Sequence, residues 1–280
     1  MAVRILTDSS ADFDLLEATE KGILFVPITI NIGDESFADG VDITKEEFFV
    51  RLERGESPTT ALPSPNTFLT HFLDAKESGD EVVAIVMSSG ISGTVQSAFL
   101  AKELADYNGI FVIDSLRMIT GLRMLVDIAC DMRDRGCSAI EIVNTVESLK
   151  LRVRIIAVVD TLEHLHKGGR LTKAQAMIGE MTNLKILIYI DDEGTVQVLD
   201  KCIGRERASR KLLSYFNEDE RDENYPIYFP YARYSENGKR LFAAIKEQYP
   251  DTEELFFNLG PTVATHIGEN AFGLTYILKE

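Results

Sequence analysis

Short apolar runs alternate with amphipathic stretches through the first half of the chain. Four continuous runs rich in Val, Ile and Leu predict strands, at residues 3–6, within 22–32, at 82–87 and at 110–113. Strands without a polar face are typical of a parallel sheet that helices cover on both sides. Apolar residues between 122 and 132 recur at helical spacing and predict a helix after the fourth strand. Residues 1–155 are therefore predicted to form a doubly wound, mainly parallel α/β domain.

The second half of the chain shows a different pattern. Two apolar stretches, 186–190 and 195–199, are joined by an acidic segment that ends in glycine, which predicts an antiparallel hairpin. Further strands are predicted at residues 227–231, 254–258 and 274–278, with helices at 205–216 and 236–248. Residues 156–280 are therefore predicted to form a second α/β domain, with a mainly antiparallel sheet and helices on one face.

The charge balance limits the classes of partner. The chain has 45 acidic and 29 basic residues and a formal net charge of −16, which repels nucleic acid and anionic lipid head groups. No apolar run approaches the length of a membrane span, and no leader pattern precedes the first strand. The three cysteines lack Cys-x-x-Cys spacing, which is typical of a reducing compartment. We therefore expect a cytoplasmic protein that neither binds nucleic acid nor is embedded in a membrane.

Several sequence motifs of known chemistry are absent. The chain has no Gly-x-Gly-x-x-Gly, no phosphate-binding loop ending in Gly-Lys-Ser/Thr, no His-Glu-x-x-His and no Gly-x-Ser-x-Gly. His164 and His166 are two residues apart, but no third ligand stands near them in the sequence. We therefore expect neither a metal nor a cofactor.

Turns rich in hydroxyl groups carry the remaining candidate chemistry. They lie at residues 7–10, 58–64, 88–94 and 114–115, each interpreted as a link from a strand to a helix. Such turns gather at the carboxyl edge of a parallel sheet, where unpaired N–H groups and the helix dipole favour an anion. Ser9, Ser92, Thr94 and Ser115 are the candidate hydroxyls, and Gly93 allows close approach of the backbone. A carboxylate or phosphate could be held there without a lysine.

The alternative is that each hydroxyl only caps its own helix, which is the commonest use of such residues. The segment 88–94 favours this alternative least, because one cap needs one hydroxyl and this segment supplies four. Two other segments stay open between a functional and an ordinary role. Arg170 follows two glycines and precedes a capping-box pattern at Thr172 and Gln175. His266 lies among small residues after Gly-Pro and could donate to an anion or be a half-buried side chain.

Taken together, these segments resemble the DegV family of bacterial fatty-acid-binding proteins. The matching stretches occur in the family's order, at residues 6–12, 88–98, 112–115, 160–171 and 260–268. The resemblance implies a two-domain fold that binds a long-chain fatty acid, such as palmitate, in a buried apolar tunnel. It implies that the protein is not itself an enzyme. Some family members present their fatty acid to a separate fatty acid kinase, which forms an acyl phosphate for phospholipid synthesis.

The resemblance also assigns residues. It implies that Thr60 and Ser92 hold the carboxylate, that His266 lies close to the same end of the ligand, and that Arg170 belongs to the encounter with the kinase. The helix start at Gly93 and Thr94 could add N–H donors. Burial of a dozen methylenes at about 0.8 kcal/mol each would supply most of the affinity.

Two departures from the family pattern bear on these assignments. Ala61 and Leu62 replace polar residues beside the head-group site, and Cys202 stands where family members often carry a basic or aliphatic residue. The alternative function is a hydrolase or phosphotransferase that acts at Ser92, Arg170 and His266, with His266 as the base. Acyl-chain length, unsaturation and oligomeric state stay open.

Overall fold

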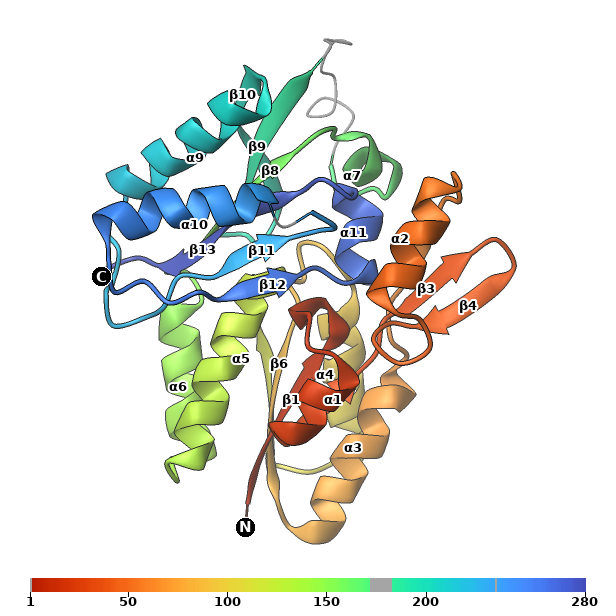
Figure 1. Ribbon diagram of the computed structural model, residues 1–280. Coiled ribbons are helices and arrows are strands. Elements are labelled where there is room, and N and C mark those ends of the chain that lie inside the picture. The colour runs from red at the N-terminus through yellow and green to blue at the C-terminus, as the bar shows by residue number, and fades with distance from the viewer. Residues whose placement is uncertain (1, 172–182, 235) are drawn as a thin grey trace.

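The computed structural model describes residues 2–171, 183–234 and 236–280 (Figure 1). The predicted capping box at Thr172 and Gln175 lies outside these ranges. Within them, no helix has both the length and the apolar character needed to traverse a lipid bilayer.

A four-stranded parallel sheet forms the centre of the first half, as predicted. Its strand order is β2 (Ile23–Val26), β1 (Val3–Asp8), β6 (Glu81–Val86) and β7 (Ile110–Asp114). One face packs on α3 (Pro65–Ser78) and α4 (Thr94–Ala105), through side chains such as Phe68, Phe72 and Val95. The other face packs on α5 (Ile119–Asp134) and α6 (Ala139–Leu149). Helices on both faces explain why these strands carry no polar side.

A six-stranded sheet forms the second half, and it is antiparallel except for one pair. Its order is β10 (Val196–Ile203), β9 (Leu184–Ile190), β8 (Val153–Val159), β13 (Phe272–Ile277), β11 (Phe229–Tyr231) and β12 (Phe256–Asn258). Only β11 and β12 pair in parallel. The helices α9 (Arg205–Glu218) and α10 (Glu236–Gln248) lie across one face (Figure 1). The predicted α/β class, hairpin and mainly antiparallel second sheet are confirmed.

The helix α5 lies between the two large sheets. It contacts β1 and β6 of the parallel sheet and also β8 and β13 of the antiparallel sheet. Eleven of its residues are therefore buried, more than a single apolar stripe would bury. Of the residues whose spacing predicted the helix, Ile128 is only half-buried. The helix prediction is confirmed, and its double-sided burial is a tertiary effect.

A third sheet corrects one prediction. The segment 58–64 was expected as a turn between a strand and a helix, but it follows α2 (Lys45–Glu53), and Thr59–Ala61 forms the strand β5. β5 joins β3 (Thr29–Ile32) and β4 (Glu35–Ala38) in an antiparallel sheet of order β4-β3-β5, hereafter the small sheet. Two β-branched threonines opposite a strand edge favour strand pairing over a turn.

The remaining elements are short. They are the 3₁₀ helix η1 (Ser9–Ala11) and the helices α1 (Leu15–Glu20), α7 (Glu163–Lys167) and α11 (Pro261–Ile267). Although α11 is distant in sequence, it packs on η1, α2 and the small sheet. The boundary between residues 155 and 156 stays a prediction; it falls inside β8, a strand of the antiparallel sheet.

Candidate functional site

A cavity of about 480 Å³ lies where the small sheet, the segment after β6 and α11 come together. We call it the polar cavity, and its lining includes Thr60, Ser92, Gly93, Thr262, Arg170 and His266. Five of these residues are candidates from the sequence. The structure therefore brings together side chains that come from four separate segments of the chain.

His266 faces the threonine that the sequence singled out. Its Nε2 atom lies 3.0 Å from the hydroxyl of Thr60, which β5 presents from the small sheet. His266 is only 7% exposed, and its Nδ1 atom is buried without a hydrogen-bond partner. Burial lowers the pKa of His266 to about 4, helped by the nearby Arg170 cation. The imidazole is therefore neutral near pH 7.

The segment between β6 and α4 contributes hydroxyls and N–H groups. The hydroxyl of Ser92 lies 2.9 Å from that of Thr94, which is fully buried as the first residue of α4. Gly93 is the N-cap of this helix and has no side chain to satisfy the first N–H groups. The start of α4 beside the cavity therefore offers unpaired donors and a partial positive charge.

Arg170 closes one side of the polar cavity. Its Nε donates to the carbonyl of Ile91 at 3.2 Å, and Nη1 donates to the carbonyl of Gly168 at 2.5 Å. Burial lowers the pKa of the guanidinium, which nevertheless stays charged at neutral pH. Because both contacts go to carbonyls, the positive charge is left available to an anion in the cavity.

An apolar chamber adjoins the polar cavity. Four residues line both spaces: Ile91, Met118, Arg170 and His266. The rest of the chamber is aliphatic apart from Tyr189, and its walls come from α5 and from strands β8 to β10 of the antiparallel sheet. Its volume is about 30 Å³. The polar cavity and this small apolar space therefore adjoin at the four shared residues.

The chamber wall includes residues that the sequence did not single out. Met118 and Ile119 follow the predicted turn at Asp114 and Ser115, and Ile119 has a φ of 56°. Positive φ is unusual for a β-branched residue and marks local strain, which clusters at binding sites. No pattern in a single sequence signals such a backbone angle.

Two of the predicted supporting residues lie outside the polar cavity. Ser9 accepts a hydrogen bond from the backbone N–H of Ile28 at 3.0 Å. Ser115 donates to the carbonyl of Arg117 at 2.9 Å and accepts from its N–H. Both hydroxyls are buried, and each orders backbone next to the site. Neither hydroxyl caps its own helix, because the N-cap residues of η1 and α5 are Asp8 and Met118.

His164 and His166 are the two histidines that the sequence places two residues apart. Both are exposed on α7. Across the ranges that the structure describes, no three His, Cys, Asp or Glu side chains are placed so that they could hold a metal ion.

The neutral state of His266 predicts a pH dependence of stability. Between pH 6.5 and about 4 the unfolded chain binds a proton on this residue and the folded protein does not, so the free energy of unfolding falls as the pH falls. The full loss from His266 is about 3 kcal/mol. Urea unfolding of His266→Gln should show a clearly smaller decrease in the free energy of unfolding between pH 7 and pH 4.5 than wild type shows.

A matched control is His166→Gln, which changes an exposed histidine near the same site. Its pH dependence should follow wild type. If His266→Gln and wild type lost the same stability between pH 7 and pH 4.5, a neutral buried imidazole would be ruled out.

Comparison with known proteins gives a consistent result. A family model described as "Uncharacterised protein, DegV family" matches residues 2–279. A DegV domain-containing protein of Caldanaerobacter subterraneus subsp. tengcongensis is 38% identical over 277 residues, which cover 98% of each chain.

Solved structures of similar proteins have the same fold. One, described as fatty acid binding of a DegV family protein from Thermus thermophilus, has a TM-score of 0.89 and 29% identity, and the match covers 99% of this chain and 100% of that chain. Another, described as DegV, a fatty acid binding protein from Bacillus subtilis, has a TM-score of 0.85 and 26% identity, with 100% of both chains covered. The descriptions of these structures name binding, not catalysis.

Proposed function

The chain belongs to the DegV family, and from this membership we propose that it binds a long-chain fatty acid such as palmitate. The acyl chain would occupy the apolar chamber, and the carboxylate would occupy the polar cavity. The observation that carries the proposal is the position of Thr60, Ser92 and His266 around one cavity that shares its wall with an aliphatic chamber. The fatty-acid binding described for the similar structures supports it.

The hydrogen bonds around His266 indicate how the carboxylate would be held. The unpartnered Nδ1 faces Gly168, where even an added Cβ atom would lie only 2.4 Å away. An N–H at Nδ1 would be a buried donor without an acceptor, which is costlier than an unused lone pair. The proton is therefore assigned to Nε2, which donates to Thr60 and leaves the threonine O–H free to donate to the ligand. Ser92 and the first N–H groups of α4 would complete the set of donors.

The size of the chamber requires its walls to move. A volume of about 30 Å³ holds one water molecule, so an acyl chain enters only if wall side chains shift outward. Met118 lies at the junction of the two spaces, and an unbranched thioether side chain adjusts its rotamers easily. Each buried methylene then contributes about 0.8 kcal/mol, while the ordering of the chain and of the moved side chains opposes binding.

The direct experiment is to extract ligand from the purified protein for mass spectrometry and to titrate delipidated protein with palmitate. A bound acyl chain and saturable binding at one site are the expected results. Repeated extraction of no lipid, together with no palmitate binding, would rule the function out.

Replacement of Ser92 by alanine tests the head-group assignment. The loss of one hydrogen bond to a charged group costs about 1.5–3 kcal/mol, so the Kd for palmitate should rise roughly 10- to 100-fold in a calorimetric titration. Ser148→Ala is the control, because Ser148 is exposed on α6 and its hydroxyl donates to the carbonyl of Thr145, away from the cavity lining; it should bind palmitate as wild type does. Equal affinities of Ser92→Ala and wild type would exclude this hydroxyl from the carboxylate site.

We further propose that a separate fatty acid kinase acts on the bound ligand. The charge of Arg170 at the side of the polar cavity supports this, because a guanidinium would stabilise the added phosphoryl group. The test is acyl-phosphate formation from the palmitate-loaded protein, ATP and a fatty acid kinase. Failure with several such kinases would exclude this partner while leaving fatty-acid binding intact.

The hydrolase alternative gains no support from the geometry. His266 is hydrogen-bonded to Thr60, not to Ser92, and its Nδ1 has no acid to orient it. A low pKa also makes it a weak base.

A further inference from the structure

The helix that carries His266 begins without a cap of its own. α11 spans Pro261–Ile267, and its N-cap residue is Gly260, which has no side chain. The first N–H groups of any helix lack partners within the helix. Because every residue of α11 is buried, water does not satisfy these groups, and acceptors must come from elsewhere in the chain.

Two buried aspartates from the first half supply these acceptors. Asp12 accepts from the N–H of Gly260 at 2.7 Å. Asp39 accepts from the N–H of Thr262 at 3.3 Å and from its hydroxyl at 2.5 Å. Their side chains are 5% and 2% exposed. Both carboxylates therefore lie at the positive end of the α11 dipole.

The position of Asp39 relates it directly to Thr60. Asp39 follows β4, and its N–H bonds to the carbonyl of Ile28 at the edge of β3. Thr60 lies on β5, on the other side of β3. The small sheet thus holds α11 at Thr262 through Asp39 and meets it again at His266 through Thr60. Thr262 and His266 are four residues apart and therefore lie on the same face of α11. Both residues line the polar cavity.

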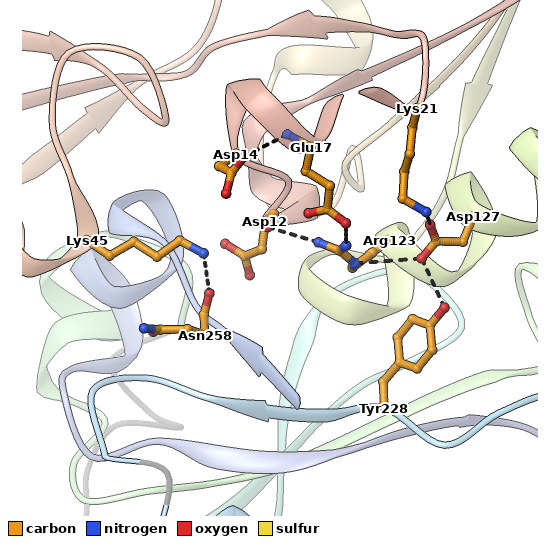
Figure 2. A network of polar contacts seen from close by, with 9 residues as sticks. All are labelled: Asp12, Asp14, Glu17, Lys21, Lys45, Arg123, Asp127, Tyr228 and Asn258. Atoms are coloured by element: carbon orange, nitrogen blue, oxygen red, sulfur yellow. Dashed lines mark hydrogen bonds and ion pairs between the residues drawn. The ribbon is translucent and has the colours of Figure 1, made fainter. Parts of the chain in front are cut away.

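Side chains from both halves of the chain surround Asp12 (Figure 2). The Nζ of Lys45 donates to the carbonyl of Asn258 at 2.5 Å. The carboxylate of Asp12 extends toward the side chain of Lys45 (Figure 2). Arg123 lies between the rings of Phe13 and Phe257, at 4.1 and 4.3 Å, and donates to the carbonyl of Asp12 at 3.1 Å. The same guanidinium pairs with Glu17 and Asp127, which also holds Tyr228 (Figure 2).

The burial of two carboxylates costs folding free energy, because both lose their hydration. Specific contacts within the protein must offset this cost. Desolvation raises the pKa of Asp12 to about 7 and also raises that of Asp39. The charge of Lys45 and the donors of α11 oppose this rise. The hydroxyl of Ser9, a supporting residue predicted from the sequence, likewise lowers the pKa of Asp39. Hydrogen bonds to buried groups of this kind make the local structure rigid.

We propose that Asp39, together with Asp12, is a positioning residue for carboxylate recognition: it fixes the start of α11 so that His266 meets Thr60 at hydrogen-bonding distance. This inference rests on the proposed fatty-acid binding. Asp39 itself does not line the polar cavity; it acts through Thr262. Its substitution is therefore expected to weaken recognition of the ligand's head and to leave binding of the tail unchanged.

The experiment compares palmitate with 1-hexadecanol, which has the same chain and no carboxylate, in full-length Asp39→Asn and Thr262→Val. Each substitution should lower the affinity for palmitate roughly 10-fold, with hexadecanol affinity changed by less than about twofold. The double variant should lose little more than either single variant, because both substitutions weaken the same contact between Asp39 and Thr262. In ¹⁵N spectra, the imidazole signals of His266 should shift in both single variants.

Asp42→Asn is the matched control, since its exposed carboxylate accepts from the N–H of Ala38 in the same loop. It should behave as wild type in every measurement. An unchanged palmitate-to-hexadecanol ratio in folded Thr262→Val and Asp39→Asn would overturn the inference. If Asp39→Asn did not fold, Thr262→Val alone would decide. Wild-type protein that bound neither compound would instead refute the proposed function.

Discussion

Replacement of Ala157 by tryptophan is expected to reduce palmitate affinity by more than about 100-fold. Ala157 lies on β8 and lines the apolar chamber with Ile155 and Ile188. An indole at this position would occupy the space that three or four methylenes of the ligand would fill. At about 0.8 kcal/mol for each methylene, the loss is about 3 kcal/mol, to be measured by calorimetric titration of delipidated protein.

The control variant is Ala243→Trp, which adds the same ring on the exposed side of α10. It should bind palmitate as wild type does. A blocked chamber should also shift the preference of Ala157→Trp toward shorter fatty acids, which misfolding would not do. If palmitate bound both variants equally well, the acyl chain would have to lie outside the chamber.

Replacement of Arg117 by methionine is expected to cost about 3–5 kcal/mol of unfolding free energy. Arg117 is 1% exposed, and its guanidinium donates to four carbonyls: Val153 at 2.8 Å, Leu116 at 2.7 Å, Asp191 at 2.9 Å and Leu151 at 3.2 Å. Methionine fills similar space without a donor, so the carbonyl of Val153 loses a buried hydrogen bond and the other three carbonyls lose part-buried ones. Burial lowers the pKa of Arg117 to about 10, so the side chain is charged at pH 7.

Urea unfolding at pH 7 measures this effect, and Arg210→Met, at an exposed position of α9, is the control. A cost below about 1 kcal/mol for Arg117→Met would show that water replaces the lost donors. The contacts of Arg117 reach the turn of the β9–β10 hairpin, where the carbonyl of Gly194 accepts from Ser88 at 2.7 Å. The same substitution should therefore also loosen the segment that carries Ser92.

Periodicity in the sequence was sufficient to predict the large elements of the fold. The runs at 82–87 and 110–113 became β6 and β7, and the predicted hairpin became β9 and β10. These segments have a continuous apolar pattern, and their local preference agrees with their tertiary packing. The small sheet was missed because Thr59–Ala61 has three residues and no apolar face. Its strand conformation depends on pairing with β3, which no local pattern signals.

The candidate site was also predictable only in part. Thr60, Ser92 and His266 stood out because hydroxyls and histidine lay in recognisable segments, and the family resemblance linked them. Asp39 gave no signal, since a single acid in a chain with 45 acidic residues is unremarkable, and Asp12 ended a matching stretch without an assigned role. Their partners, Thr262 on α11 and Gly260 at its N-cap, are 223 and 248 residues away in sequence. Only the folded arrangement identifies them.

The late position of α11 has a consequence for the timing of assembly. Thr60 and His266 are 206 residues apart, and α11 settles onto strands and helices made from the first 61 residues. During translation, residue 267 must therefore leave the ribosomal exit tunnel before α11 can pack on the N-terminal segments and complete the cavity. Contacts this distant along the chain form slowly during folding. A nascent polypeptide is therefore expected to bind its proposed ligand only after nearly all of these 280 residues have been translated.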